Sequence, residues 1–95
     1  MSQSKKAVVI DSRDNVATAI SELESGERVE LDGGEVVLRE PIQFGHKFAL
    51  VAIPEGSYVM KYGARIGRAT QAIQEGEHVH IHNVQDITDE VRKEV

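Results

Sequence analysis

The 95-residue sequence contains no cysteine. This absence excludes disulfide bonds, thiolate-bound zinc and thiol nucleophiles, and it fits a chain that works in the cytoplasm. No apolar run approaches the ~20 residues needed to span a bilayer. The amino end, residues 1–6, also lacks the apolar region and cleavage site of a secretory signal. We therefore expect a cytoplasmic protein with no membrane partner.

Positive charge is scarce as well, because 11 lysines and arginines face 16 acidic residues and give a net charge of -5. Proteins that bind nucleic acid generally present a basic face, so we expect no nucleic-acid partner. Residues 56–74, however, contain no acidic residue and carry Lys61, Arg65 and Arg68. This stretch either holds a small anionic ligand or forms a solvated basic surface.

The length of the chain predicts one small domain over residues 1–95 with a single modest core. We expect the ordered core to cover about residues 6–83. Residues 84–95 are polar and end without a clear helix cap, so they predict a tail or a segment that docks on a partner.

Short apolar segments separated by glycine-rich turns predict a compact, mainly β fold. The turn residues Asp32-Gly33-Gly34 lie between two alternating segments and predict a tight hairpin. The expected strands are residues 6–11, 28–31, 35–38, 48–52, 58–63, 64–70 and 77–83.

One short helix is expected near residues 14–25. Asp14 is a good N-cap residue, and Gly26 supplies the left-handed residue that often ends a helix. Between them, apolar residues recur at helical spacing: Val16, Ala19, Ile20 and Leu23.

A turn motif is repeated along the chain. Residues 52–59 match residues 72–79 at an offset of 20 residues, and residues 23–29 form a weaker third copy. Each copy closes on a glycine and leads into a strand, which indicates a small β structure that reuses similar turns.

Three of the four histidines lie within five residues, in Glu77-His78-Val79-His80-Ile81-His82-Asn83. In an extended strand, alternate residues share one face and are about 6.6 to 6.8 Å apart. We therefore expect the three imidazoles on one face, with Val79 and Ile81 anchored in the core on the other.

Two adjacent imidazoles on such a strand can bind one metal ion, and His80 is the first candidate because it can pair with His78 or with His82. All three cannot bind together on a straight strand, because the outer pair would be about 13 Å apart and Zn–N bonds measure about 2.0 to 2.1 Å. A third ligand must come from elsewhere in the fold, a bend, the substrate or a second subunit. The alternative is a solvated strand face.

The fourth histidine, His46, lies beside Gly45 at the entrance of a predicted buried strand. Such a position suits binding or catalysis, because a loop residue there is exposed and is held by rigid neighbours. A loop histidine without a function is the alternative.

Several motifs together resemble the N-terminal SAF-type domain of the altronate and galactarate dehydratase family. They cover nearly the whole chain, and they are Asp14-Asn15-Val16-Ala17, Gly45-His46-Lys47, Lys61-Tyr62-Gly63, Ile66-Gly67-Arg68-Ala69-Thr70 and Gly76 to Asn83. The resemblance implies a β-clip fold and a sugar-acid hydro-lyase that uses a divalent metal, usually ferrous iron.

In long members of this family a large catalytic region follows the SAF domain, whereas this sequence stops where that region would begin. It therefore resembles the small subunit of two-component members, which include the alpha subunit of sulfolactate sulfo-lyase. The resemblance implies a large catalytic subunit as partner and an anionic hydroxy acid as substrate, from which water or sulfite is eliminated with base, acid and metal assistance.

The expected site residues follow from these motifs. His46, His78, His80 and His82 are expected to be catalytic, and His78, His80 and His82 are the candidate metal ligands. The residues expected to bind substrate are Lys47, Lys61, Arg65, Arg68 and Asn83. Arginine suits a carboxylate or sulfonate better than lysine does, because its planar guanidinium can donate two hydrogen bonds to one anionic group. The alternative function is a non-catalytic SAF module that binds a sugar acid or a partner protein.

Overall fold

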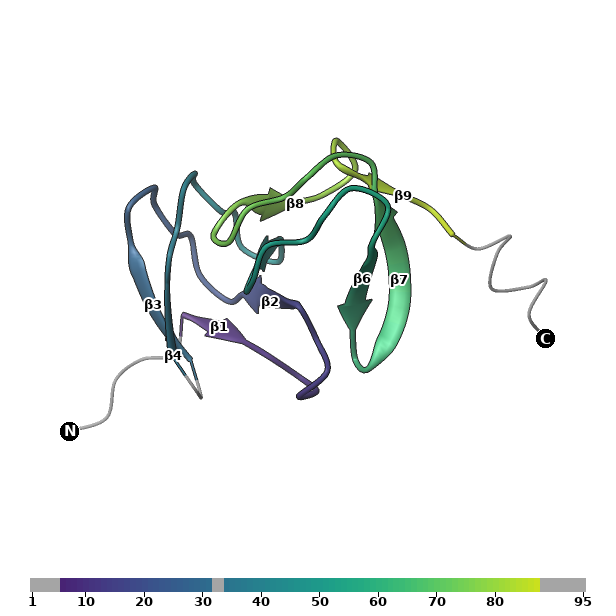
Figure 1. Ribbon diagram of the computed structural model, residues 1–95. Helices are drawn as coiled ribbons and strands as arrows, with labels where there is room; N and C mark the ends of the chain where they lie inside the picture. Colours follow the sequence, from purple (N-terminus) through teal and green to yellow (C-terminus); the bar gives the residue numbers. More distant parts are fainter. Residues whose placement is uncertain (1–5, 32–33, 88–95) are drawn as a thin grey trace.

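The structure is a computed structural model that describes residues 6–31 and 34–87. Nine short strands form the described part of the chain, and all neighbouring strands pair antiparallel (Figure 1). They are β1 (Ala7–Val8), β2 (Val16–Ala19), β3 (Arg28–Leu31), β4 (Gly34–Val37), β5 (Lys47–Ala49), β6 (Tyr58–Lys61), β7 (Ala64–Ala69), β8 (His78–Val79) and β9 (Val84–Gln85).

A four-stranded sheet in the order β1-β2-β5-β8 forms the centre of the fold. The β3–β4 hairpin lies on one side of this sheet, and the three-stranded sheet β6-β7-β9 lies on the other (Figure 1). The expected mainly β fold is therefore confirmed. Within residues 6–31 and 34–87, no helix is long and apolar enough to cross a membrane.

The predicted helix near residues 14–25 is wrong, because Val16–Ala19 form strand β2 between β1 and β5. Asp14 does not cap a helix; its carboxylate accepts hydrogen bonds from the backbone N–H groups of Asp11 and Gly63. Tertiary packing overrides the local helical spacing here, since a strand at this place can bury side chains on both of its faces.

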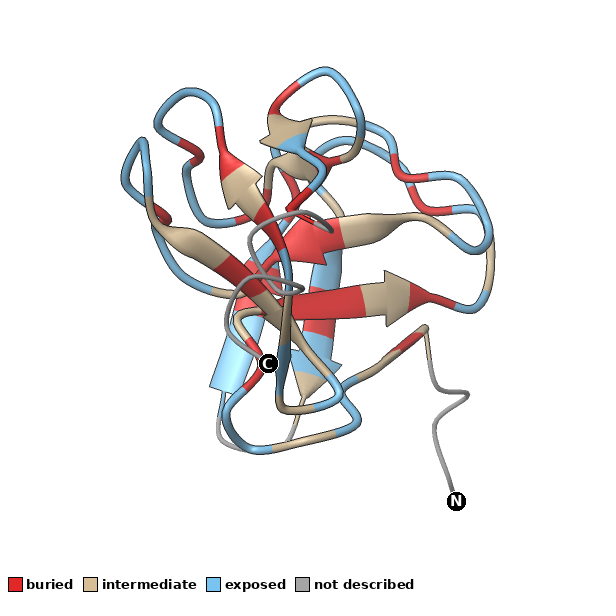
Figure 2. Ribbon diagram, turned by 90° about the vertical axis from the view of Figure 1, so that its right-hand side faces the viewer, coloured by how far each residue is buried: buried red, intermediate tan, exposed pale blue. Residues whose placement is uncertain are grey.

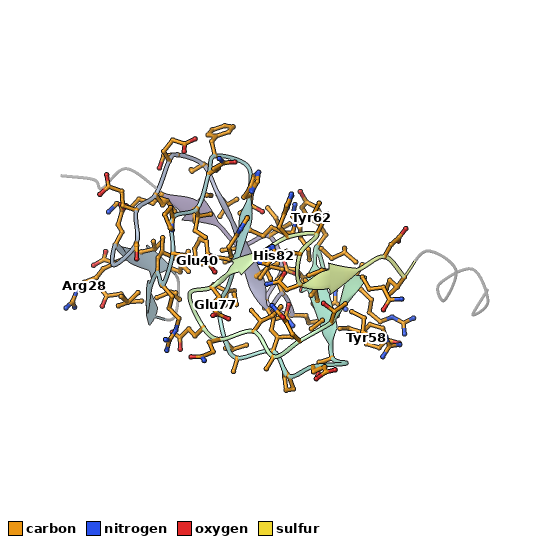
Figure 3. The ribbon with its side chains drawn as sticks, turned by 90° about the horizontal axis from the view of Figure 1, so that it is seen from above. Arg28, Glu40, Tyr58, Tyr62, Glu77 and His82 are labelled. Carbon is orange, nitrogen blue, oxygen red and sulfur yellow. The ribbon has the colours of Figure 1, made fainter. Side chains whose placement is uncertain are left out.

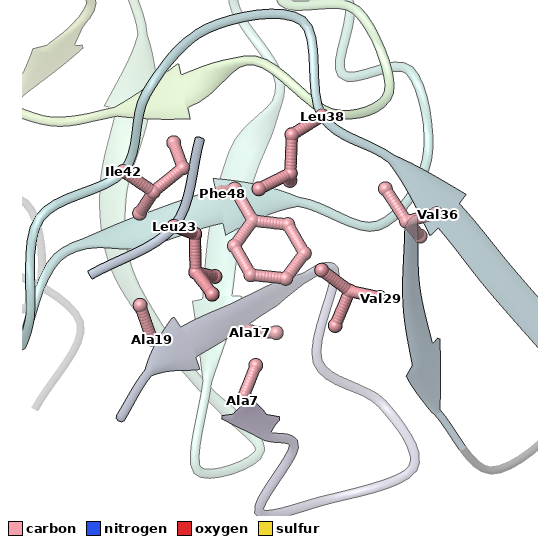
Figure 4. Close-up of a cluster of buried hydrophobic side chains, with 9 residues drawn as sticks. All are labelled: Ala7, Ala17, Ala19, Leu23, Val29, Val36, Leu38, Ile42 and Phe48. Carbon is pink, nitrogen blue, oxygen red and sulfur yellow. The ribbon is translucent and has the colours of Figure 1, made fainter. Parts of the chain in front are cut away.

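Two hydrophobic clusters make up the core, one on each side of the central sheet. Strands β2 and β5 contribute to both, because Ala17 and Phe48 enter the first cluster whereas Val16 and Ala49 enter the second. The first cluster surrounds Phe48 and includes residues of the β3–β4 hairpin (Figure 4). Buried segments consequently run through the middle of the molecule, with exposed loops around them (Figure 2).

The repeated turns confirm the reuse of one motif and extend it to a fourth copy. In each copy a buried apolar residue precedes a left-handed glycine by three positions, and a second buried residue follows the glycine by three positions. The glycines are Gly26, Gly45, Gly56 and Gly76, with φ between 83° and 87°. The copies meet in pairs, because single backbone bridges join Leu23 to Ile42 and Ile53 to Ile73.

The sequence comparison missed the copy around Gly45, because Phe44 and His46 replace the acidic or hydroxyl residues that flank the other glycines. His46 occupies the position that Glu27 and Glu77 hold in their copies. Each of those glutamates accepts a hydrogen bond from a backbone N–H of its own turn. This copy therefore presents an imidazole where two other copies present a capping carboxylate.

Of the predicted tail or docking segment at 84–95, the structure describes the first four residues. Val84–Gln85 form β9, which pairs with β7, and Ile87 is buried. These residues continue the folded core past residue 83. Residues 88–95 lie outside the described part of the chain.

Candidate metal centre

His46, His78 and His80 come together where β5 and β8 pair. The register places Lys47 opposite Val79 and Phe48 opposite His78. His46 and His80 are the residues that flank this short ladder at one end. The imidazoles of His46 and His80 are stacked, with their centroids 4.4 Å apart. The ring of His78 lies 5.0 Å from His46 and 5.3 Å from His80. We call these three residues the histidine trio.

The histidine trio is suited to hold one metal ion. One ring nitrogen from each residue lies within 4.8 Å of the other two. Two nitrogens on a common ion, each about 2.1 Å from it, are about 3.4 Å apart in tetrahedral geometry, so each pair of nitrogens in the trio needs to approach by at most about 1.4 Å. Neutral imidazole is a common ligand for zinc, copper, iron and nickel. The residues present therefore fit a divalent transition metal.

Of the sources left open for a third ligand, the structure offers one from elsewhere in the fold, the ring of His46. The sequence places it 32 residues from His78, yet the Nδ1 atom of His46 lies 2.8 Å from the Nε2 atom of His78. At this distance the two rings share a hydrogen bond, with one nitrogen as donor and the other as acceptor. The antiparallel pairing of β5 and β8 supplies the proximity that spacing along one strand could not.

The surroundings favour the neutral form of these imidazoles. Burial lowers the pKa of His78 below its ordinary value, the nearby histidines lower it further, and Glu40 acts in the opposite direction. The pKa of His80 is also lowered, first by burial and then by His46 and Lys47. A metal binds only the neutral imidazole, so both shifts leave the ligand nitrogens available at neutral pH.

The chain turns immediately after β8, and this turn places Ile81 and His82 differently from the predicted straight strand. Val79 is fully buried as expected, but Ile81 is 84% exposed, so its predicted anchoring in the core is wrong. The strand ends at Val79, and a tight turn over residues 81–83 breaks the alternation. The ring of His82 still lies 5.3 Å from His78, tilted by 35°, but it is not part of the trio.

Comparison with known proteins identifies the domain. Residues 5–87 match the family model described as the altronate/galactarate dehydratase SAF domain. The chain belongs to this family. The resemblance in the sequence motifs is thereby confirmed, and the SAF domain accounts for the described fold.

Two altronate dehydratases are similar to most of this SAF domain. The protein of Escherichia coli strain K12 is 46% identical over 76 residues, which are 80% of this chain and 15% of that protein. The protein of Bacillus subtilis strain 168 is 40% identical over 79 residues, which are 83% of this chain and 16% of that protein. The chain thus spans about a sixth of the length of these relatives.

A third relative is itself a small chain. The (2R)-sulfolactate sulfo-lyase subunit alpha of Chromohalobacter salexigens is 47% identical over 47 residues, which are half of this chain and half of that subunit. The relatives are therefore hydro-lyases and a sulfo-lyase subunit.

Asn83 shapes the loop that carries the last two histidines of this SAF domain. Its side-chain oxygen accepts the backbone N–H of His80 at 2.9 Å, and its side-chain nitrogen donates to the carbonyl of His78 at 2.8 Å. The residue is buried, and these two bonds use both ends of its amide. The structure therefore gives Asn83 a positioning role, and its expected contact with substrate stays a prediction.

Glu40 is a site residue that the sequence reasoning missed. Its carboxylate accepts the backbone N–H of His78 at 2.9 Å, although the two residues are 38 positions apart. Figure 3 shows Glu40 on a segment next to the one that leads through Glu77 to His82. No local pattern marks Glu40 as a site residue, because its contact depends on the tertiary packing of the segment before Pro41 against β8.

Lys47 accompanies the histidine trio. It lowers the pKa of His80, and its own pKa is lowered by burial and by the charge of Lys61. Lys47 and His80 both line a cavity of about 300 Å³. The other walls are mostly apolar, and they are Val59, Ile66, Val79, Ile81, Val84, Gln85 and Asp86. Of the predicted substrate-binding residues, the structure brings Lys47 to the trio and Lys61 within electrostatic reach of Lys47.

The two arginines of the cationic stretch lie elsewhere. Arg65 and Arg68 both pack over the ring of Tyr58, at 5.0 Å and 4.6 Å from its centroid. Arg68 also donates a hydrogen bond to the Tyr58 hydroxyl. Figure 3 shows Tyr58 well apart from His82. The basic stretch of the sequence is therefore divided between two places.

Proposed function

We propose that this SAF domain is the small component of a metal-dependent lyase that acts by elimination on an anionic hydroxy acid. The observation that carries the proposal is the histidine trio, whose ring nitrogens lie within 4.8 Å of one another. The names of the relatives support the reaction class, since they are altronate dehydratases and a sulfolactate sulfo-lyase subunit.

In this proposal His46, His78 and His80 hold the metal, and iron(II) is the expected ion. A divalent metal in such a site supplies Lewis-acid stabilisation of the negative charge that develops on the substrate oxygens. The hydrogen bond between His46 and His78 keeps their rings oriented, and the hydrogen bond of the His78 backbone to Glu40 holds that end of β8. The site is therefore positioned before a ligand arrives.

Charge recognition in the proposed site comes from Lys47. Its ammonium group lies near His80, and Lys61 adds to the local positive potential. Two lysines beside a metal suit a carboxylate or a sulfonate, because each attracts the anion as a point charge. Arg65 and Arg68 pack on Tyr58, and their expected contact with substrate stays a prediction.

Proton transfer in the proposed reaction involves His82. Its ring lies beside His78 but outside the metal-binding group. An imidazole that is not bound to metal can accept or donate a proton near neutral pH. The remaining catalytic groups and the cover that excludes water come from a large catalytic chain, in line with the small share of the altronate dehydratases that this domain matches. The assembly works in the cytoplasm.

The test is to purify the tagged chain from the cells that make it, and to analyse its partner, its metal and its activity together. We expect a larger chain to co-purify, iron to be present, and altronate, galactarate or sulfolactate to be consumed with release of water or sulfite. A complex that turns over these acids without bound metal would overturn the metal-dependent reading. A complex that binds the acids but never converts them would instead identify a non-catalytic binding module.

A further inference from the structure

A second concave surface lies away from the histidine trio, and none of the four histidines lines it. It is a groove of about 1150 Å³ between β1, the β3–β4 hairpin and the segment after β5. Its apolar walls come from these three parts of the chain, and they include Val8, Val9, Ile10, Leu31, Leu50 and Val51. We call this surface the β1 groove.

The β1 groove is acidic as well as apolar. Among residues 6–31 and 34–87, five acidic residues line it and no lysine, arginine or histidine does so. Asp14 is buried and accepts two backbone hydrogen bonds, so it is part of the fold. Glu30 and Glu75 line the groove without an ion pair to any other described residue.

Two further carboxylates of the β1 groove have cationic partners on the surface. Asp11 pairs with Arg13 at 3.0 Å, and Glu35 pairs with Arg28 at 3.5 Å. Both pairs lie at the surface, where salt screens them. Arg13 binds both carboxylate oxygens of Asp11, whereas Arg28 makes a single contact with Glu35. The groove therefore keeps a negative potential that a cationic ligand would neutralise.

Strand β1 offers an open edge in this place. It is the last strand of the central sheet, with β2 as its one neighbour among the described strands. Beyond it, Val9 and Ile10 make no backbone hydrogen bond to another described residue. The two residues are 37% and 55% exposed. An apolar strand edge with unpaired backbone groups is a template for the addition of another strand.

We propose that the β1 groove binds an extended segment of a partner protein in which apolar residues alternate with lysine or arginine. The backbone of the segment pairs with the edge at Val8–Ile10, and its apolar side chains, which share one face of the added strand, lie beside Ile10. Its cationic side chains face Glu30 and Glu75. A second copy of this chain is a poor occupant, because the chain carries a net charge of -5 and would bring acidic residues against an acidic groove.

This proposal depends on the charge, the apolar lining and the open edge, and not on metal binding or catalysis. Only the further step of naming the larger lyase chain as the partner rests on the proposed function. The two can fail separately, because peptide binding in the β1 groove and metal binding by the histidine trio are measured in different experiments.

The test uses two synthetic peptides of about six residues, the usual length of a strand. One alternates valine with lysine, and the other has glutamate in place of lysine. Each is titrated into the isotope-labelled chain while amide signals are followed by NMR. We expect the lysine peptide to shift the signals of Val8–Asp11, Leu50 and Val51 in a saturable way, and to bind at least about tenfold more tightly than the glutamate peptide.

Two matched pairs of variants locate the contact. Glu30→Lys should weaken binding of the lysine peptide about tenfold, whereas Glu55→Lys, an exposed glutamate outside the groove, should not. Ile10→Ser should weaken it similarly, whereas Val37→Ser, an exposed valine outside the groove, should not.

Equal affinity for both peptides, or no shift of the groove signals, would overturn the proposal. So would equal effects of the groove variants and their controls. A doubled mass in sedimentation that Ile10→Ser abolishes would assign the groove to self-association and would also overturn it.

Discussion

His46 shows how one residue changes the use of a repeated structural unit. At the equivalent positions of two other turns, Glu27 and Glu77 accept hydrogen bonds within their own turns. His46 instead directs its ring to His78 of β8 and to His80 just after this strand, and its Nδ1 atom lies 2.8 Å from Nε2 of His78. The backbone of the turn is kept, because Gly45 has the same left-handed conformation as the other three glycines. The four turns thus share one backbone conformation, and the imidazole at position 46 distinguishes this copy from the others.

Single histidine substitutions test the membership of the trio. His46→Ala, His78→Ala and His80→Ala should each lower the affinity for a divalent metal by at least about tenfold, because each removes a ligand nitrogen. His82→Ala is the matched control and should leave the affinity within about threefold, a change below 1 kcal/mol. Calorimetric titration with a divalent metal measures all four. An equal loss in His82→Ala would mean that the ligand set is different.

Asn83 and Glu40 illustrate a second kind of site residue. Neither is in the group of possible metal ligands, yet each holds backbone atoms of the segment that carries His78 and His80. Sequence reasoning singled out Asn83 because it follows the histidines, and it had no reason to single out Glu40. The reason is physical. A hydrogen bond within one turn depends on neighbouring residues and can be inferred from the local sequence, whereas a contact between residues 38 positions apart cannot.

At the scale of elements, the four similar turns organise both halves of the core. Each turn places one buried apolar residue before its glycine and another in the strand that follows. The copies around Gly26 and Gly45 contribute to the first hydrophobic cluster, and the copies around Gly56 and Gly76 contribute to the second. Each cluster is therefore built from two turns that face each other through a single backbone bridge.

Alanine substitutions in two of these turns separate backbone strain from steric overlap. Gly56 and Gly76 share a left-handed backbone, so alanine should cost about 1 to 2 kcal/mol of unfolding free energy at either position. A Cβ atom at Gly56 would meet nothing within 4 Å, whereas one at Gly76 would overlap the carbonyl oxygen of Val37. Gly76→Ala should therefore cost about 1 to 3 kcal/mol more than Gly56→Ala.

Urea denaturation of both variants and the wild type measures this difference. If the two variants are equally stable, the close approach of the turn at Gly76 to β4 does not exist in solution.

At the scale of the whole molecule, the histidines couple stability to pH. The folded pKa values of His78 and His80 lie below their ordinary value of 6.5. The unfolded chain therefore takes up protons first as the pH falls, and unfolding becomes easier. We expect full stability of the metal-free chain above about pH 7, and a loss that begins near pH 6.5 and continues down to the folded pKa values.

Urea midpoints recorded from pH 8 to pH 5 test this expectation. His80→Gln should reduce the loss below pH 6.5, because it removes one of the two shifted groups. A midpoint that rises as the pH falls would contradict the direction of both shifts.

The features that depend on local spacing could be predicted from the sequence. Glycines at turns and alternating apolar residues were sufficient to predict a mainly β fold and the repeated turn. The motifs from Asp14 to Asn83 were sufficient for the family, which the match over residues 5–87 confirms. These features can be recognised in the sequence, because a turn or a strand is specified by neighbouring residues.

Contacts between distant side chains, in contrast, became known from the fold. It made Val16–Ala19 a strand between two cores, where a helical spacing had predicted a helix. The pairing of β5 with β8 brings His46 close to His78 and His80. The turn after β8 leaves Ile81 exposed to solvent. Burial on both faces of a strand and contacts across a sheet arise from segments far apart in the chain, so no local pattern contains them.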